Sequence, residues 1–274
     1  MKWVKILGVA VAVLAAVVYF GLPRALTVMG LNPQYDMPEF DLAGKRALII
    51  TTSQASLGEG GKATGVYGSE LTVPYYAFLD AGLTVDVASI KGGKIPVEPY
   101  SMGWPLAAGE DYRFKNDTVA MAKLTNSIPI SALDISKYDA VFLSGGWGAA
   151  YDFGQSAELG ALITAANARG AVLGSVCHGA LGFLQAKNPD GTPFLAGRHV
   201  TAVSDLQITQ LGIEITPLHP EREMRAAGAH FEKQSAFRDI FATDVVVDGR
   251  LVTGQNQNSG AETAAKMMEM LAKP

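Results

Sequence analysis

Short apolar segments rich in β-branched residues alternate with helix-like stretches along this 274-residue chain, and this alternation constrains the fold more than any other feature. Strands are predicted at 46–53, 83–90, 139–146, 171–176, 199–205 and 244–254. Helices are predicted at 118–124, 156–169, 179–187 and 260–271, the last with Ser259 and Glu262 at capping-box spacing. Near-continuous apolar strands separated by helices are typical of a mostly parallel sheet covered on both faces. The pattern therefore predicts a doubly wound α/β domain with three layers.

A second constraint lies at the start of the chain, where an uncharged apolar run extends from Ile6 to Leu22. Its length is about the minimum that spans a bilayer as a helix. No small-x-small cleavage site follows it, which favours an uncleaved anchor over a signal peptide. Lys2 and Lys5 precede the run and Arg24 stands beyond it, so the positive-inside rule places the N-terminus in the cytoplasm.

We therefore expect a single-pass protein of the inner membrane with three parts. Residues 1–22 form the signal anchor, a transmembrane helix, and residues 23–44, which contain three prolines, form a linker. Residues 45–274 form a flavodoxin-like α/β sandwich on the periplasmic or extracytoplasmic side. The net charge of -4, without long runs of one sign, gives no reason to expect nucleic acid as a partner. A homodimer stays open.

Cys177 is the only cysteine of the chain, which excludes an intrachain disulfide and any CxxC motif. An apolar strand runs directly into it in "AVLGSVCHGALGFL", and a helix-like stretch follows at once. Ser175 and Gly179 are small enough for the sharp strand-to-helix turn of a nucleophile elbow. Free N–H groups and a helix dipole at such a turn favour a thiolate, so the sequence predicts a lowered pKa for this thiol. An inert buried cysteine is the alternative.

Other side chains are predicted to act with the thiol. His178 is the expected proton carrier, and Asp205, at the end of "HVTAVSD", is the candidate for holding its tautomer, with a helix N-cap as the alternative for Asp205. Gly145 and Gly146 end a strand in "FLSGGWGA" and, with the backbone N–H of His178, form the expected oxyanion hole. Glu70, in "YGSELTVPYYAF", is expected at a helix start near the strand ends.

These segments together resemble the ThiJ/PfpI superfamily, also called the DJ-one superfamily, within the class I glutamine amidotransferase-like fold. The likeness covers residues 45–272 and rests on "GVYGSELTVPYYAFLDAGLTVDVASIKGG", "YDAVFLSGGWGAAYDF", "GSVCHGALGFL", "GRHVTAVSD" and "VVVDGRLVTGQNQNSGAETA" in this order. The most similar branch contains heat-shock holding chaperones and cofactor-independent glyoxalase III enzymes. The resemblance implies Cys177 as nucleophile, His178 as its partner and Glu70 as the acid that faces it, with no cofactor and no metal.

Some positions depart from the pattern of that branch. Trp147 stands where most relatives have the histidine of Gly-Gly-His-Gly, and Gln257 and Asn258 stand where Pro-Ala is common. A tryptophan there changes the pocket shape and removes a proton-transfer or metal-binding group. Some members take a third acidic residue from the position of Asp205, whereas others take it where this chain has Ile208. The N-terminal anchor departs as well, because characterised relatives are mostly soluble and intracellular.

The resemblance implies a glyoxalase III-like lyase of the D-lactate dehydratase type, which converts a small aldehyde such as methylglyoxal to a hydroxy acid. Cys177 would attack the aldehyde carbon, His178 would move a proton through an enediol, and Glu70 would set the charge of the site. Within enzymes, a cysteine amidase or peptidase is the second candidate. Outside enzymes, the candidate is a membrane-tethered stress chaperone whose thiol senses oxidants. The histidine directly after the cysteine favours catalysis, and Trp147 favours the chaperone.

Overall fold

The central sheet has seven strands in the order β3–β2–β1–β4–β5–β9–β8 in the computed structural model, which describes residues 2–235 and 239–273. The strands are β1 Arg46–Thr51, β2 Thr84–Ser89, β3 Ile128–Pro129, β4 Ala140–Leu143, β5 Val172–Val176, β8 Val245–Asp248 and β9 Leu251–Gly254. Neighbouring strands are parallel except β8 and β9, which form an antiparallel hairpin. The prediction of a mostly parallel sheet is confirmed.

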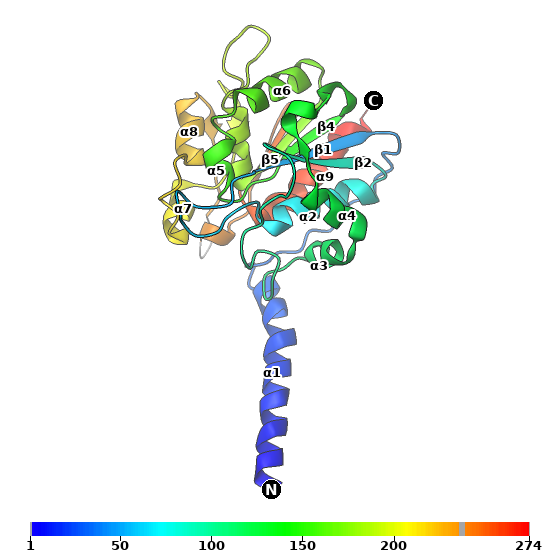
Figure 1. Cartoon of the computed structure of the whole chain (residues 1–274), viewed down its shortest axis with the longest axis vertical. Coiled ribbons are helices and arrows are strands. Elements are labelled where there is room, and N and C mark those ends of the chain that lie inside the picture. The colour runs from blue at the N-terminus through cyan, green and yellow to red at the C-terminus, as the bar shows by residue number, and fades with distance from the viewer. Residues whose placement is uncertain (1, 236–238, 274) are drawn as a thin grey trace.

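Helices cover both faces of this sheet (Figure 1). The α-helices of the domain are α2 Gly68–Asp80, α3 Gly109–Asn116, α4 Thr118–Thr125, α5 Ala149–Asp152, α6 Ala157–Ala168, α7 Asp205–Leu211, α8 Pro220–Ala226 and α9 Gly260–Ala272. Short 3₁₀ helices occupy Ile130–Ala132, Ile135–Lys137, Cys177–Phe183, Asp239–Phe241 and Gln257–Ser259. The predicted helices at 118–124, 156–169 and 260–271 correspond to α4, α6 and α9.

Two buried apolar clusters hold the layers together, one on each face of the sheet. Ile49 of β1 packs into the cluster that contains Phe78 of α2 and Met267 of α9. Leu48, its neighbour in β1, packs into the other cluster with Ile163 of α6. Successive side chains of a strand point to opposite faces, so a strand buried on both sides must be apolar throughout. This requirement explains the near-continuous apolar runs in the sequence.

Two predicted strands differ from the structure. The segment 199–205 contributes only β6, His199–Val200, which pairs with β7, His230–Phe231, in a separate small sheet. The segment 244–254 is the hairpin of β8 and β9 rather than one strand, and Gly249 at its turn has a φ of +60°. A turn with positive φ suits glycine, which was the available signal for the hairpin.

Two predicted helix features also differ. The segment 179–187 forms no α-helix, because the chain after the cysteine is the 3₁₀ helix Cys177–Phe183. The predicted capping box of α9 does not form, because Ser259 adopts helical backbone angles and its Oγ accepts the N–H of Asp244 at 3.3 Å. The side chain thus stabilises a contact between distant segments instead of a helix start.

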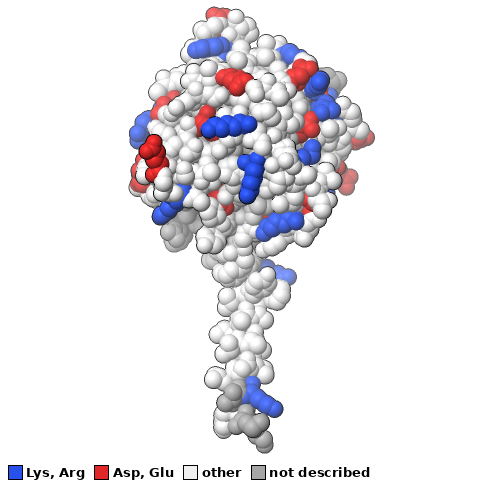
Figure 2. All heavy atoms as spheres, in the orientation of Figure 1, with Lys and Arg blue, Asp and Glu red and all other residues white. Residues whose placement is uncertain are grey.

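Helix α1, Lys2–Val28, projects from the domain (Figure 1). Figure 2 shows an uncharged surface along the middle of its visible face. In the described part of the chain, Lys5–Val28 is the one stretch of helix long and apolar enough to cross a bilayer. The helix continues through Pro23 to Val28, so the first residues of the linker predicted at 23–44 are helical. This linker packs on the domain, where the N–H of the buried Leu42 donates to the carbonyl of Ala81 at 2.8 Å.

Candidate active site

Cys177 follows β5 directly and has a φ of +56°, in the left-handed region that non-glycine residues rarely adopt. The surrounding glycines leave room for this turn. A Cβ added to Gly179 would lie 2.1 Å from the carbonyl oxygen of Leu143, and one added to Gly145 would lie 2.8 Å from the backbone nitrogen of His178. Larger residues would therefore displace the turn. The sharp turn predicted at Cys177 is therefore present, whereas its role as nucleophile stays a prediction.

Polar groups surround the Cys177 sulfur on several sides. Its Sγ lies 3.4 Å from Nδ1 of His178. The backbone N–H groups of His178 and Gly146 lie close enough to the sulfur to lower its pKa, whereas the prediction for them was to stabilise an anionic intermediate. The carboxyl group of Glu70 lies beside both the thiol and the N–H of Gly145, and its buried Oε2 has no hydrogen-bond partner among the described residues. A Cβ added to Gly145 would lie 2.5 Å from this oxygen, so the glycine leaves room for the acid.

Glu70 lies in the first turn of α2, at the helix start where the sequence predicts it, and is 1 % exposed. Burial raises its pKa well above the usual range, and the nearby charge of Glu98 raises it further. The neighbouring thiol and the N–H of Gly145 lower the pKa but do not outweigh burial. Burial therefore favours the protonated carboxyl group, which is the form that can donate a proton.

The thiol of Cys177 does not have the lowered pKa that the elbow predicts. Burial raises its pKa well above the usual value, and an ionised Glu70 would raise it further. The N–H groups of His178 and Gly146 lower the pKa but remain the weaker influence. Cys177 is only 7 % exposed, so removing the thiolate from water outweighs the few donors at the turn. The thiol is therefore protonated at neutral pH.

His178 is fully buried, and burial lowers its pKa to about 3, with a smaller contribution from His219. The imidazole is therefore neutral at physiological pH, and its Nδ1 lies beside the thiol. Its Nε2 has no hydrogen-bond partner among the described residues. The structure thus brings His178 to the sulfur as predicted but supplies no side chain to hold its ring.

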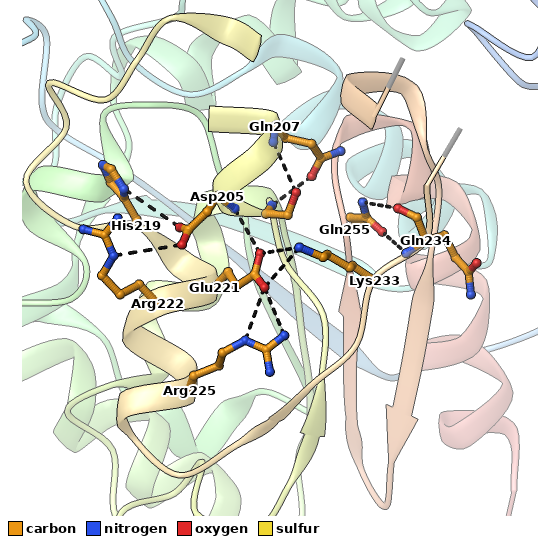
Figure 3. A network of polar contacts seen from close by, with 10 residues as sticks. Asp205, Gln207, His219, Glu221, Arg222, Arg225, Lys233, Gln234 and Gln255 are labelled. Atoms are coloured by element: carbon orange, nitrogen blue, oxygen red, sulfur yellow. Dashed lines mark hydrogen bonds and ion pairs between the residues drawn. The ribbon is translucent and has the colours of Figure 1, made fainter. Parts of the chain in front are cut away.

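Asp205 does not orient His178, contrary to the prediction. Its Oδ1 lies 3.9 Å from Nδ1 of His219 and its Oδ2 lies 4.0 Å from Nε of Arg222, both on or beside α8 (Figure 3). The alternative role as N-cap belongs to Ser204, whose Oγ accepts the N–H of Gln207. The backbone turns into α7 at this point, and the carboxylate faces α8 rather than the thiol.

Glu98 is a site residue that the sequence analysis missed. Its side chain is 6 % exposed, and its Oε1 accepts the N–H of Trp147 and lies 3.5 Å from Oγ1 of Thr64. Burial raises its pKa to about 7. When ionised, its charge raises the pKa of both Glu70 and Cys177. Only "PVEPY", a carboxylate between two prolines, marks this position in the sequence, and nothing local links it to the elbow.

A cavity of about 140 Å³ opens onto the sulfur. Besides Cys177 and Glu70 it is lined by Tyr67, Leu106, Gly146, Trp147, Val203, Gln207, Leu211, Ile240, Phe241, Asn256 and Gln257. Its wall is mostly apolar, so the polar groups around the sulfur act in a region of low dielectric. Within residues 2–235 and 239–273 no group of three His, Cys, Asp or Glu side chains is placed to hold a metal ion.

A parallel α/β sandwich with a cysteine at a strained elbow, a histidine beside it and a buried acid facing it defines a class of cysteine-nucleophile proteins. The DJ-1/PfpI family model matches residues 62–270, which include every side chain that contacts the sulfur. This chain therefore belongs to the DJ-1/PfpI family.

Individual relatives agree with this assignment. A glutathione-independent glyoxalase of Schizosaccharomyces pombe is 31% identical over 84% of this chain and 98% of its own length. The solved structure of Rapid Encystment Protein 24 kDa from Francisella tularensis has a TM-score of 0.77 and 28% identity, covering 83% of this chain and 99% of that one. The crystal structure of glyoxalase III from Candida albicans has a TM-score of 0.75 and 26% identity, covering 82% of this chain and 96% of that one.

Proposed function

We propose that this protein is a glutathione-independent glyoxalase of the glyoxalase III type, which converts a small 2-oxoaldehyde such as methylglyoxal to a hydroxy acid. The proposal rests on one observation. A neutral imidazole and a buried carboxyl group whose pKa is raised both lie beside one buried thiol, at the base of a small cavity. The glyoxalase names of relatives that match along most of their length support the same reaction.

The first step joins the thiol to the aldehyde. The sulfur of Cys177 attacks the aldehyde carbon, and its proton passes through Nδ1 of His178 to the aldehyde oxygen, which gives a hemithioacetal. The neutral imidazole lies 3.4 Å from the sulfur and can pass the proton on, and because burial disfavours its charged form, no stable imidazolium forms. The N–H groups of His178 and Gly146 stabilise negative charge on the sulfur while the proton is away.

The second step moves hydrogen between adjacent carbons. His178 removes the proton of the former aldehyde carbon and returns it to the neighbouring carbonyl carbon through an enediol. The carboxyl group of Glu70 donates a hydrogen bond to the enediol oxygen, because burial favours its protonated form. The product is a thioester on Cys177. Water then attacks the thioester, the C–S bond breaks, and the sulfur regains its proton as the hydroxy acid leaves.

The test is turnover of methylglyoxal by the purified full chain in detergent without glutathione, followed by lactate formation. We expect wild type to form lactate and Cys177→Ser to form none, because serine keeps the turn but lacks a comparable nucleophile. A peptide and a simple amide serve as the comparison substrates. The proposal is wrong if wild type produces no more lactate than Cys177→Ser.

We further propose that α1 tethers the domain to the inner membrane, with the domain on the periplasmic or extracytoplasmic side. The support is the uncharged run from Ile6 to Leu22, whose side chains are largely exposed on the helix rather than packed on the domain. Two lysines stand before the run and only Arg24 stands shortly after it, which favours a cytoplasmic N-terminus.

A further inference from the structure

A tryptophan of the catalytic domain contacts α1 at the point where a proline interrupts the hydrogen bonds of that helix. Pro23 has no N–H, so the usual helical bond to the carbonyl of Tyr19 cannot form. The indole Nε1 of Trp104 donates to this carbonyl at 3.1 Å. The rings of Trp104 and Tyr19 also stack, with centroids 5.9 Å apart and planes 6° apart. The domain thus supplies the donor that the helix lacks.

The contact lies at a defined depth along α1. Tyr19 is near the end of the uncharged run, and at ~1.5 Å rise per residue it lies about 7 Å along the axis from Arg24. In a helix that spans a bilayer this level is the boundary between hydrocarbon and headgroups, where tryptophan and tyrosine concentrate. Trp104 reaches the same level, and Tyr100 in the same loop is 94 % exposed.

The loop that carries Trp104 also borders the reactive cavity. It descends beside the end of α1 (Figure 1), and Leu106 at its end lines the cavity over Cys177. Leu106 also lines an adjoining cavity together with Leu31 and Tyr35, which follow α1 in the chain. Tyr67, Phe241 and Gln257 line both cavities. The space above the sulfur therefore continues toward the end of the domain that faces the membrane helix.

We propose that residues 100–106, which we call the interface loop, are a second membrane contact that lies in the bilayer interface and is latched to α1 by the Trp104–Tyr19 hydrogen bond. The partner is the lipid headgroup region. In this proposal the Trp104–Tyr19 hydrogen bond, which we call the latch, orients the opening of the reactive cavity toward the headgroups. Lys115 of α3 donates to the carbonyl of Met102, which holds the loop and places a cation beside it. The inference rests on the proposed membrane tether and does not depend on turnover.

The first experiment measures how deeply each tryptophan lies in the bilayer. The full chain is reconstituted in vesicles of phosphatidylcholine and phosphatidylglycerol whose acyl chains are brominated near the headgroup. Its three tryptophans are Trp3, Trp104 and Trp147. We expect bromine to quench Trp104 in the variant Trp3→Phe/Trp147→Phe, and to leave Trp147 unquenched in Trp3→Phe/Trp104→Phe. The emission difference between Trp3→Phe and Trp3→Phe/Trp104→Phe isolates Trp104 without changing Trp147 in the cavity wall.

Quenching of Trp3 distinguishes the interface-loop proposal from the membrane-tether proposal. Trp3 lies at the far end of α1, so the variant Trp104→Phe/Trp147→Phe reports whether the helix is inserted. Quenching of Trp3 without quenching of Trp104 overturns the interface loop and leaves the tether intact. Absence of quenching at Trp3 overturns the tether, and the interface loop with it. Lactate formation by wild type in the same vesicles tests the enzyme proposal separately.

The second experiment tests the latch by exchanging its donor. Trp104→Phe keeps an aromatic ring but removes the indole N–H, and Pro23→Ala restores the helical donor to the Tyr19 carbonyl. We expect Trp104→Phe to accelerate tryptic cleavage after Arg24 in detergent by about two- to tenfold, the effect of one hydrogen bond. Pro23→Ala/Trp104→Phe should return toward the wild-type rate. Equal cleavage of wild type and Trp104→Phe would contradict the latch.

Discussion

The Sγ of Cys177 lies 3.4 Å from Nδ1 of His178, and burial keeps that imidazole neutral by lowering its pKa to about 3. The two side chains are therefore not a preformed thiolate–imidazolium pair. Burial raises the pKa of the thiol, so the thiol keeps its proton at neutral pH, and in the proposed reaction this proton passes through the imidazole. Burial also raises the pKa of Glu70 beside the sulfur, which favours its protonated form.

Replacing the buried acid should separate catalysis from the chaperone alternative. We expect Glu70→Gln to lower kcat/KM for methylglyoxal by about two to four orders of magnitude, because the amide cannot supply the proton. Suppression of client aggregation, which depends on apolar surface, should be unchanged in Glu70→Gln and Cys177→Ser. Circular dichroism checks that the fold is retained. If wild type suppresses aggregation but consumes no aldehyde, the chaperone is the better assignment.

Glu98 should control the ionisation of the thiol from a distance. Its charge raises the pKa of Glu70 and Cys177, so Glu98→Gln should shift the pH midpoint of Cys177 alkylation to lower pH. The iodoacetamide rate measured against pH reports this midpoint. Wild type should have its midpoint above that of an ordinary thiol, about 8.5. Asp205→Asn serves as the control carboxylate and should leave the midpoint unchanged. An unshifted midpoint in Glu98→Gln would remove Glu98 from the site.

His178 should make the folded state sensitive to acid. Its pKa is 6.5 in the unfolded chain and about 3 in the fold, so the unfolded state binds more protons between these values. Stability contributed by the neutral imidazole is thus present above pH 6.5 and is lost as pH falls toward 3, by up to ~1.4 kcal/mol per pH unit. His178→Gln should weaken this dependence. Urea unfolding of both proteins at pH 7, 6 and 5 measures the difference, and parallel curves would contradict it.

Asp205 should be dispensable for turnover. Its carboxylate faces His219 and Arg222 and forms no hydrogen bond with His178 in the described residues. We expect Asp205→Asn to retain kcat/KM within about tenfold of wild type, which is less than the loss from removing a general acid or base. Cys177→Ser is the matched inactive variant. A loss of about a hundredfold or more would mean that Asp205 reaches the imidazole once substrate is bound.

If α1 spans the membrane, the protein should be found in the membrane fraction and its domain should lie on one defined side. We expect it to stay in the membrane fraction after carbonate extraction, and protease added to spheroplasts to digest the domain. A variant without residues 2–28 should appear in the soluble fraction. Protection of the domain in spheroplasts would reverse the proposed topology, and extraction of the full chain by carbonate would argue against a spanning helix.

Local sequence patterns were enough to predict the α/β layers and the elbow. A strand buried on both faces must be apolar throughout, and the sharp turn at Cys177 requires small neighbours such as Gly179, so both features appear within a few residues. Glu70 was placed near a helix start because Pro74 suits a first helical turn, and Glu70 does lie in the first turn of α2 although Pro74 lies inside that helix. The strand at 199–205 was placed in the wrong sheet, because an apolar run indicates extended backbone but does not specify which strand it pairs with.

The sequence by itself determined the candidate nucleophile and the histidine beside it, and the family resemblance implied Glu70 as the acid that faces the thiol. Only the tertiary structure decided their protonation, because desolvation of Cys177, Glu70 and His178 depends on segments far along the chain that close over them. It also brought Glu98 to the site and turned Asp205 away from it. Electrostatic effects act through space and burial rather than through sequence spacing, so no local pattern could reveal these two outcomes.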